Sequence, residues 1–315
     1  MKRTSLLLLV LAVFLLASCS SETITSNQNT FLGGTTGLLV NFVEGEPPLE
    51  VTDGNATPFT VSIKLENRGE TEIAADDVLI SLRGIDPISF SVTLDEIINQ
   101  HPTSMILKND LNPDNGEKID SPPVYFTFPM MNYQGSLAGN DDFPFVVDVC
   151  YKYRTLATSK LCVKENTMDS THNDVCTVSE KKSVQNSGAP IQIVSFDESS
   201  AGQDAVAFSV KIKDMGSGLL AQQGTMCNDH AGTKNIVKLT VDTGISGLTC
   251  GGLSNPSTTG TAYSGDIRMS TGEVSVRCTQ QLSPADKSDK VMIVDMFIDY
   301  DYQESKATSV LVKHI

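Results

Sequence analysis

Alternation of apolar and polar residues is the dominant pattern along this chain. Over residues 59–65, the apolar side chains of Phe59, Val61, Ile63 and Leu65 fall on one face. A period of two is typical of a half-buried strand. The same alternation returns at residues 208–212, 237–241, 274–278 and 294–302. Turn-forming clusters separate these segments, and only one short helix is predicted after the N-terminal segment, at residues 95–99. The chain is therefore predicted to be all-β.

The last of these strands carries aspartates on its polar face. Asp295, Asp299 and Asp301 alternate with the apolar residues of the 294–302 segment. Acidic side chains on one face of a strand keep that face solvated and discourage pairing with other chains. We therefore expect this face to be exposed to water rather than to bind a metal.

Several segments recur at a nearly constant distance, which indicates tandem copies. Residues 59–64 (FTVSIK) match residues 208–213 (FSVKIK), an offset of 149. The Tyr-x-Tyr motif at residues 151–153 matches residues 300–302 at the same offset, and residues 40–44 match 194–198 at an offset of 154. Matches in the same order at a fixed spacing argue for a repeat. Two tandem immunoglobulin-like β-sandwich domains are predicted, at residues 33–165 and 190–315, joined by a connector at 166–189.

The N-terminal segment has the pattern of a cleaved export signal. Lys2 and Arg3 precede an apolar run at residues 6–16, which is too short to span a bilayer comfortably. The sequence Leu-Ala-Ser-Cys that ends at Cys19 resembles the lipobox of prokaryotic lipoproteins. The resemblance implies a signal peptide at residues 1–18, a diacylglyceryl group on Cys19 that attaches the protein to the membrane, and a lipidated flexible tether at residues 19–32. An ordinary secretory signal is the alternative.

The lipobox resemblance also implies a location. The protein would be extracytoplasmic and membrane-anchored, either on the cell surface or on the periplasmic face of an outer membrane. Ser20 after the lipidated cysteine resembles the outer-membrane sorting pattern of bacteria, whereas in an archaeon the domains would face outward. The lineage stays open.

A second resemblance concerns the domains. Residues 59–69 (FTVSIKLENRG) are similar to the strand and turn of CARDB-type immunoglobulin-like domains of prokaryotic surface proteins. Residues 33–38, the turn at 84–87, a hairpin between Cys150 and Cys162 and a terminal Tyr-x-Tyr hairpin resemble uncharacterised two-domain surface proteins of archaea. These motifs are structural, so they imply a fold and a location and no catalytic residue.

Six further cysteines are expected to form disulfides, because their number is even and the compartment is oxidising. They are Cys150, Cys162, Cys176, Cys227, Cys250 and Cys278. A hairpin centred near Thr155 would pair Cys150 with Cys162; Cys250 would pair with Cys278, which leaves Cys176 for Cys227. A rival scheme joins Cys162 to Cys176 and Cys150 to Cys227. No Cys-x-x-Cys and no cysteine–histidine spacing supports a zinc site.

Charge and composition exclude some classes of partner. The net charge of −15 disfavours nucleic acid and anionic lipid headgroups. Tryptophan is absent and aromatic residues make up 6% of the chain, which gives little material for a carbohydrate-stacking surface.

Several polar motifs are candidate binding or modification sites. Residues 110–116 (DLNPDNG) approach a calcium-binding loop, but the twelfth position is Ser121 instead of a glutamate, so we interpret them as a turn. Asn55 opens a glycosylation sequon, whose use the sequence leaves open. The histidines, His101, His172, His230 and His314, show no metal or catalytic spacing, and no nucleophile or phosphate-binding motif is present. No catalytic residue, metal or cofactor is predicted.

These observations favour a non-enzymatic, lipid-anchored surface protein with a structural or adhesive role. Its expected partner is another envelope protein or a second copy of itself, through exposed loops and strand edges. A ligand- or glycan-binding lipoprotein is the alternative, and a hydrolase with an unrecognised site is a third hypothesis.

Overall fold

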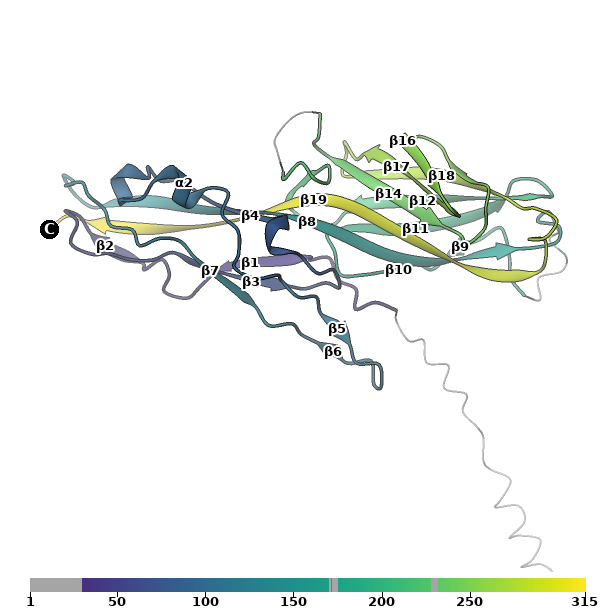
Figure 1. The fold of residues 1–315 in the computed structure, drawn as a ribbon, viewed down its shortest axis with the longest axis horizontal. Coiled ribbons are helices and arrows are strands. Elements are labelled where there is room, and N and C mark those ends of the chain that lie inside the picture. Colours follow the sequence, from purple (N-terminus) through teal and green to yellow (C-terminus); the bar gives the residue numbers. More distant parts are fainter. Residues whose placement is uncertain (1–29, 170, 172–174, 228–231) are drawn as a thin grey trace, which may run out of the picture.

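The computed structural model describes residues 30–169, 171, 175–227 and 232–315, and these are almost entirely β-strands (Figure 1). The predicted all-β class is confirmed. The predicted signal peptide and the predicted lipid-attachment residue Cys19 lie outside the described residues. The described part of the chain contains no helix that is long and apolar enough to cross a membrane.

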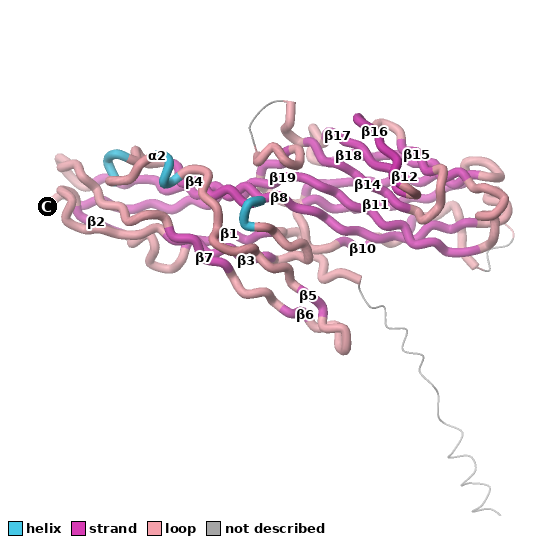
Figure 2. Tube along the Cα trace, in the orientation of Figure 1, coloured by secondary structure: helices cyan, strands magenta, loops and turns pink. Residues whose placement is uncertain are grey.

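The strands are numbered in chain order and the molecule is elongated (Figure 2). The strands of the first half are β1 (Leu38–Phe42), β2 (Glu50–Thr52), β3 (Ser62–Asn67), β4 (Val78–Arg83), β5 (Asp110–Leu111), β6 (Lys118–Ile119), β7 (Val124–Thr127) and β8 (Asp141–Val163). Those of the second half are β9 (Lys181–Lys182), β10 (Gln185–Asn186), β11 (Ile191–Ser200), β12 (Ala205–Asp214), β13 (Leu219–Ala221), β14 (Ile236–Asp242), β15 (Leu248–Cys250), β16 (Ser254–Thr259), β17 (Ala262–Arg268), β18 (Glu273–Gln281) and β19 (Lys290–Lys313). The helical elements are the 3-10 turns η1 (Ala75–Asp77) and η2 (Ile88–Phe90) and the helix α2 (Leu94–Ile97).

Two very long strands, β8 and β19, form a ribbon along the whole molecule. They pair antiparallel from Val163 opposite Lys290 to Asp141 opposite Val312. At about 3.3 Å per residue, this central ribbon is about 75 Å long. Figure 1 shows it running from one end of the molecule to the other, with the C-terminus at one tip.

The central ribbon contributes to two packed units. In the first unit, β4, the first half of β8, the second half of β19 and β2 form one sheet, and β1, β3 and β7 form the other. In the second unit, the remaining halves of β8 and β19 join β10, β14, β17 and β16, and the facing sheet is β15-β18-β12-β11-β9. The buried apolar residues of both units form one connected core. The immunoglobulin-like assignment of the units stays a prediction.

Strand sharing crosses the predicted domain limits. Residues 311–313 of the predicted second domain pair with β2 of the first unit. Residues 157–158 of the predicted first domain pair with β10. The first unit therefore contains the second half of β19, and the second unit contains the second half of β8.

The hairpins predicted within residues 150–162 and at the terminal Tyr-x-Tyr motif are wrong. Thr155 lies in the middle of β8, fully buried, and its hydroxyl donates to the Ile191 carbonyl at 2.6 Å. No glycine or asparagine interrupts β8 or β19, and the one proline, Pro144, lies near the start of β8. Without a turn-forming residue, the alternation simply continues as strand.

The predicted short helix is confirmed as α2. Thr93 precedes it, and the Glu96 carboxylate accepts from both the backbone N–H and the hydroxyl of Thr93 at 2.8 Å. This reciprocal arrangement is a capping box, which satisfies donors at the start of a helix. The buried Ile97 holds α2 against the core.

Candidate functional site

The two Tyr-x-Tyr motifs meet where the two units join. In the central ribbon, Tyr300 is directly opposite Tyr153, and Tyr302 is opposite Tyr151. The four rings are almost completely buried, with neighbouring centroids 5.6 to 6.3 Å apart. Motifs that match at an offset of 149 are therefore paired with each other across the ribbon.

Each tyrosine hydroxyl bonds to a different part of the chain. The Tyr153 hydroxyl lies 3.2 Å from the carbonyl of Gly188 in the connector, and the Tyr151 hydroxyl accepts from the Leu38 N–H of β1 at 3.3 Å. The Tyr302 hydroxyl accepts from the Gly218 N–H at 2.9 Å. Burial raises the pKa of all four tyrosines, which keeps them neutral. The tyrosine cluster is therefore a structural junction.

The predicted solvated aspartate face is only partly correct. Asp295 is exposed, but Asp299 and Asp301 are 5% and 0% exposed. Arg154 on β8 holds Asp299 through two nitrogens, at 2.6 and 3.2 Å. Asp301 accepts from the backbone N–H groups of residues 224 and 226 at 3.1 and 2.6 Å, and burial raises its pKa. The segment that covers Asp301 is held down by a disulfide at Cys227.

The structure contains three disulfides, Cys150–Cys227, Cys162–Cys176 and Cys250–Cys278. The pairing of Cys250 with Cys278 is confirmed, and the rival scheme is correct for the other four cysteines. The pairing of Cys150 with Cys162 is wrong because both lie on β8, twelve residues and about 40 Å apart. Cys176 instead ties the connector to β8. Three disulfides are the mark of an oxidising, extracytoplasmic environment.

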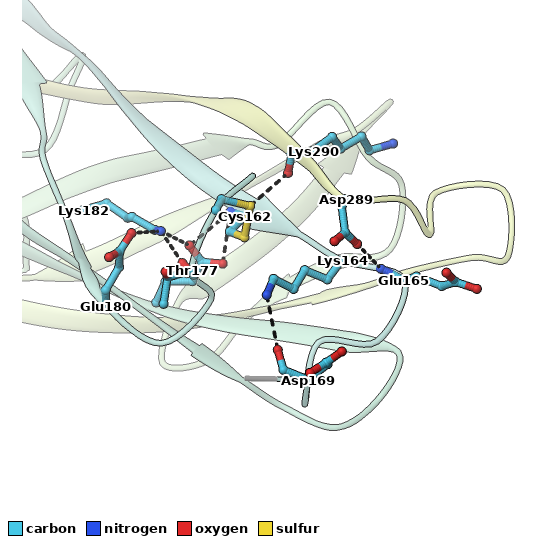
Figure 3. The surroundings of a disulfide bond; sticks show 11 residues. Cys162, Lys164, Glu165, Asp169, Thr177, Glu180, Lys182, Asp289 and Lys290 are labelled. Atoms are coloured by element: carbon cyan, nitrogen blue, oxygen red, sulfur yellow. Dashed lines mark hydrogen bonds and ion pairs between the residues drawn. A yellow bond between two sulfur atoms is a disulfide. The ribbon is translucent and has the colours of Figure 1, made fainter. Parts of the chain in front are cut away.

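A buried ion pair lies beside the Cys162–Cys176 disulfide. Both carboxylate oxygens of Glu198 accept from the Cys162 N–H at 3.1 Å, and Lys182 lies 3.4 Å away. Figure 3 shows Lys182 also reaching Glu180 and the Thr177 carbonyl. The Glu198 side chain has no exposed surface, and burial raises its pKa to about 7. Sequence periodicity gave no sign of this buried carboxylate, which occupies an inward position of β11.

Glu198 makes the stability of the protein depend on pH. Its carboxyl has a pKa of about 7 in the folded chain and the ordinary value of 4.5 in the unfolded chain, so the folded chain binds the proton more tightly. The contribution of Glu198 to the free energy of unfolding is therefore fully present below about pH 4.5 and is lost as the pH rises through about 7. We expect Glu198→Gln to remove about 2 to 3 kcal/mol of the loss between about pH 5 and about pH 8. Urea unfolding of both proteins at the two pH values measures this. Equal pH dependence of the two proteins would contradict the prediction.

A groove opens where the first unit meets the second. It has a volume of about 440 Å³ and is lined by residues 35–36 and 38–40, the turn at 215–217 and residues 304–306 of β19. Glu304 is half-buried and Lys306 is exposed. We call it the waist groove. It brings together three segments that are remote in the sequence.

The other candidate sites are accounted for. Residues 110–111 are β5, and residues 112–116 form the turn that leads to β6. In this turn the side chain of Asn112 accepts from the Asp114 N–H at 2.9 Å and its carbonyl accepts from the Gly116 N–H at 2.8 Å, so the predicted turn is confirmed. Within the described residues, no group of three or more histidine, cysteine or acidic side chains is placed to hold a metal. His314 lies 2.8 Å from Asp53, His101 is exposed, and His172 and His230 lie outside the described residues. Asn55 of the sequon is exposed, with a left-handed backbone (φ 64°).

Comparison with known proteins identifies no family for this chain. No protein-family model matches it, and no curated protein matches it. Among solved structures, it is similar to the secreted serine protease VesC from Vibrio cholerae, at 10% identity and a TM-score of 0.18. That similarity covers 84% of this chain and 50% of the protease, so the chain spans about half of that protein. At this TM-score, the similarity carries no argument about fold or activity.

Proposed function

We propose that this chain is a non-enzymatic, lipid-anchored envelope protein that acts through contact with another protein. The observation that carries the proposal is the central ribbon, which joins both units through unbroken strands. A shared ribbon and a common core fix the two units relative to each other, as a structural or adhesive module requires. The disulfide between the connector and β8 adds a covalent tie beside the ribbon.

The membrane anchor in this proposal rests on the lipobox resemblance at Cys19. We expect the native protein to incorporate an alkyne-labelled fatty acid and to fractionate with membranes. The Cys19→Ser protein should carry no label and should no longer fractionate with membranes, because no other cysteine precedes the folded part of the chain. Metabolic labelling followed by membrane fractionation measures both. Ser20→Ala is the matched control and should retain the label; label retained by Cys19→Ser would contradict the anchor.

Cross-linking mass spectrometry on intact cells tests the contact role. Reproducible links from either unit to one envelope protein, or to a second copy, are the expected result. The absence of protein links, together with binding to a glycan array, would overturn the proposal in favour of a glycan-binding lipoprotein.

A further inference from the structure

The waist groove is bordered by a stretch of β19 that pairs with β8 on one edge and has no strand on the other. The Leu311 N–H donates to the Leu49 carbonyl on the side away from β8, and Gln303 pairs with Leu219 of β13 on that same side. Backbone groups alternate along a strand, so those of Ser305, Ala307 and Ser309 also point away from β8. Among the described residues, none of these three has a strand partner there. The open edge therefore spans residues 304–309, between β13 and β2.

The interior face of β19 is also open along this stretch. Its apolar side chains at residues 294–302 and at Val310 and Val312 are buried. Between them the same face carries the half-buried Glu304 and Thr308 and the exposed Lys306. A sandwich that was closed here would bury this face. The facing strand, β1, pairs only with β3 among the described residues, and on its other edge the Leu38 N–H donates to the Tyr151 hydroxyl rather than to a strand.

The corresponding edges of the second unit are covered. By the sequence match of residues 40–44 with 194–198, β1 of the first unit corresponds to β11 of the second. In the second unit, β9 covers the outer edge of β11 at Phe196 and Asp197. By the match of the Tyr-x-Tyr motifs, Lys306 and Ala307 of β19 correspond to residues 157 and 158 of β8. In the second unit, β10 covers the edge of β8 at those two residues. Two strands from the connector therefore occupy in the second unit the positions that are vacant around the waist groove.

The carboxylates beside the groove lack a cation. Burial raises the pKa of Glu304, and the charge of Asp214, the residue before the 215–217 turn, raises it further. Burial also raises the pKa of Asp214. In the described part of the chain, neither carboxylate has a lysine, arginine or histidine within ion-pair distance; Lys306 lines the groove without pairing with either. In the second unit, Lys182 of the covering strand β9 pairs with the buried Glu198.

We propose that the waist groove binds an extended segment of a partner protein, which adds as a strand to residues 304–309 of β19 and places a lysine or arginine beside Glu304 and Asp214. This inference rests on the proposed contact function and names its partner by chemistry. Strand addition supplies backbone hydrogen bonds, and the carboxylates supply selectivity for a basic residue. The net charge of −15 disfavours a second copy as the occupant. Lys306 at the edge discourages indiscriminate pairing with other strands.

Site-specific photo-cross-linking in cells that express the protein tests the proposal. Lys306→p-benzoylphenylalanine places the probe in the groove, and Ile293→p-benzoylphenylalanine places it on an exposed position of the same strand in the second unit. We expect an adduct at residue 306 and not at 293, with mass spectrometry locating it next to a lysine or arginine in an extended segment of another protein. An adduct on a second copy, or on a segment without a basic residue, overturns the proposal.

Two further variants, each carrying the residue-306 probe, separate the edge from the carboxylates. Ala307→Pro removes an N–H that faces the open edge and leaves the ladder to β8 in place. Glu304→Gln removes the charge, whereas Asp295→Asn removes an exposed carboxylate outside the groove and is the matched control. We expect Ala307→Pro and Glu304→Gln each to lower the adduct yield roughly tenfold, because each removes an edge hydrogen bond or a charge-assisted hydrogen bond to the partner. The Asp295→Asn control should leave the yield unchanged. Unaltered yield in both overturns the proposal.

The outcome also distinguishes this inference from the proposed function. If residue 306 gives no adduct while lysine cross-linking still links the protein to an envelope partner, the groove proposal fails and the contact function stands. If neither method gives a protein partner, the contact function fails too.

Discussion

Tyr300→Ala should lower the free energy of unfolding by about 3 to 5 kcal/mol, the cost of removing a fully buried aromatic side chain. Tyr300 is completely buried, its ring is tilted against that of Tyr153 and edge-on to that of Tyr302, and its hydroxyl lies 3.0 Å from that of Thr155. Urea unfolding measures the loss. Val291→Ala, at a position of β19 that is 43% exposed, is the control and should cost less than about 1 kcal/mol.

The loss at Tyr300 should appear in both units together. Hydrogen exchange of the Tyr300→Ala protein should accelerate in β3 of the first unit and in β12 of the second, because both units contain halves of β8 and β19. Faster exchange in one unit alone would show that the units open independently.

Removal of the Cys150–Cys227 disulfide is the second large effect. This bond closes 77 residues of sequence, and the loop-entropy relation gives a loss of about 4.5 kcal/mol for Cys150→Ala with Cys227→Ala. The control removes Cys250–Cys278, which closes 28 residues and should cost about 1 kcal/mol less. Denaturant unfolding of both double variants measures the difference. Wild-type stability in the first variant would mean that the 222–227 segment keeps its place over Asp301 without the bond.

Local signals predicted the elements well and their partners poorly. Alternation identified the strands around Phe59, Phe208 and Val294, and the capping residues around Thr93 are consistent with the short helix at α2. Alternation states which face of a strand is apolar, but not which strand lies beside it. The pairing of Tyr151 with Tyr302 was therefore hidden in what looked like a simple repeat.

The hairpin error and the buried aspartates have different causes. The absence of a turn residue around Thr155 was visible in the sequence and argued against a hairpin. Burial of Asp299 and Asp301 was not visible, because their partners come from β8 and from the 222–227 segment. The waist groove left one sequence signal, since Glu304, Lys306 and Thr308 interrupt an apolar face that resumes at Val310.

The path of β19 also sets an order of events for a chain that emerges N-terminus first. Residues 305–313 follow the whole second unit in the sequence, yet they supply a strand to the first unit, between β8 and β2. The first unit cannot be completed until the second has been synthesised, so its apolar faces stay uncovered for most of that time. Non-local pairing of this kind is slow and exposes a chain to aggregation. A chain that ends before residue 305 would lack one strand of its first unit but would keep all the strand pairs of its second unit. Cellular quality control would therefore have to recognise the first unit, although it is synthesised first.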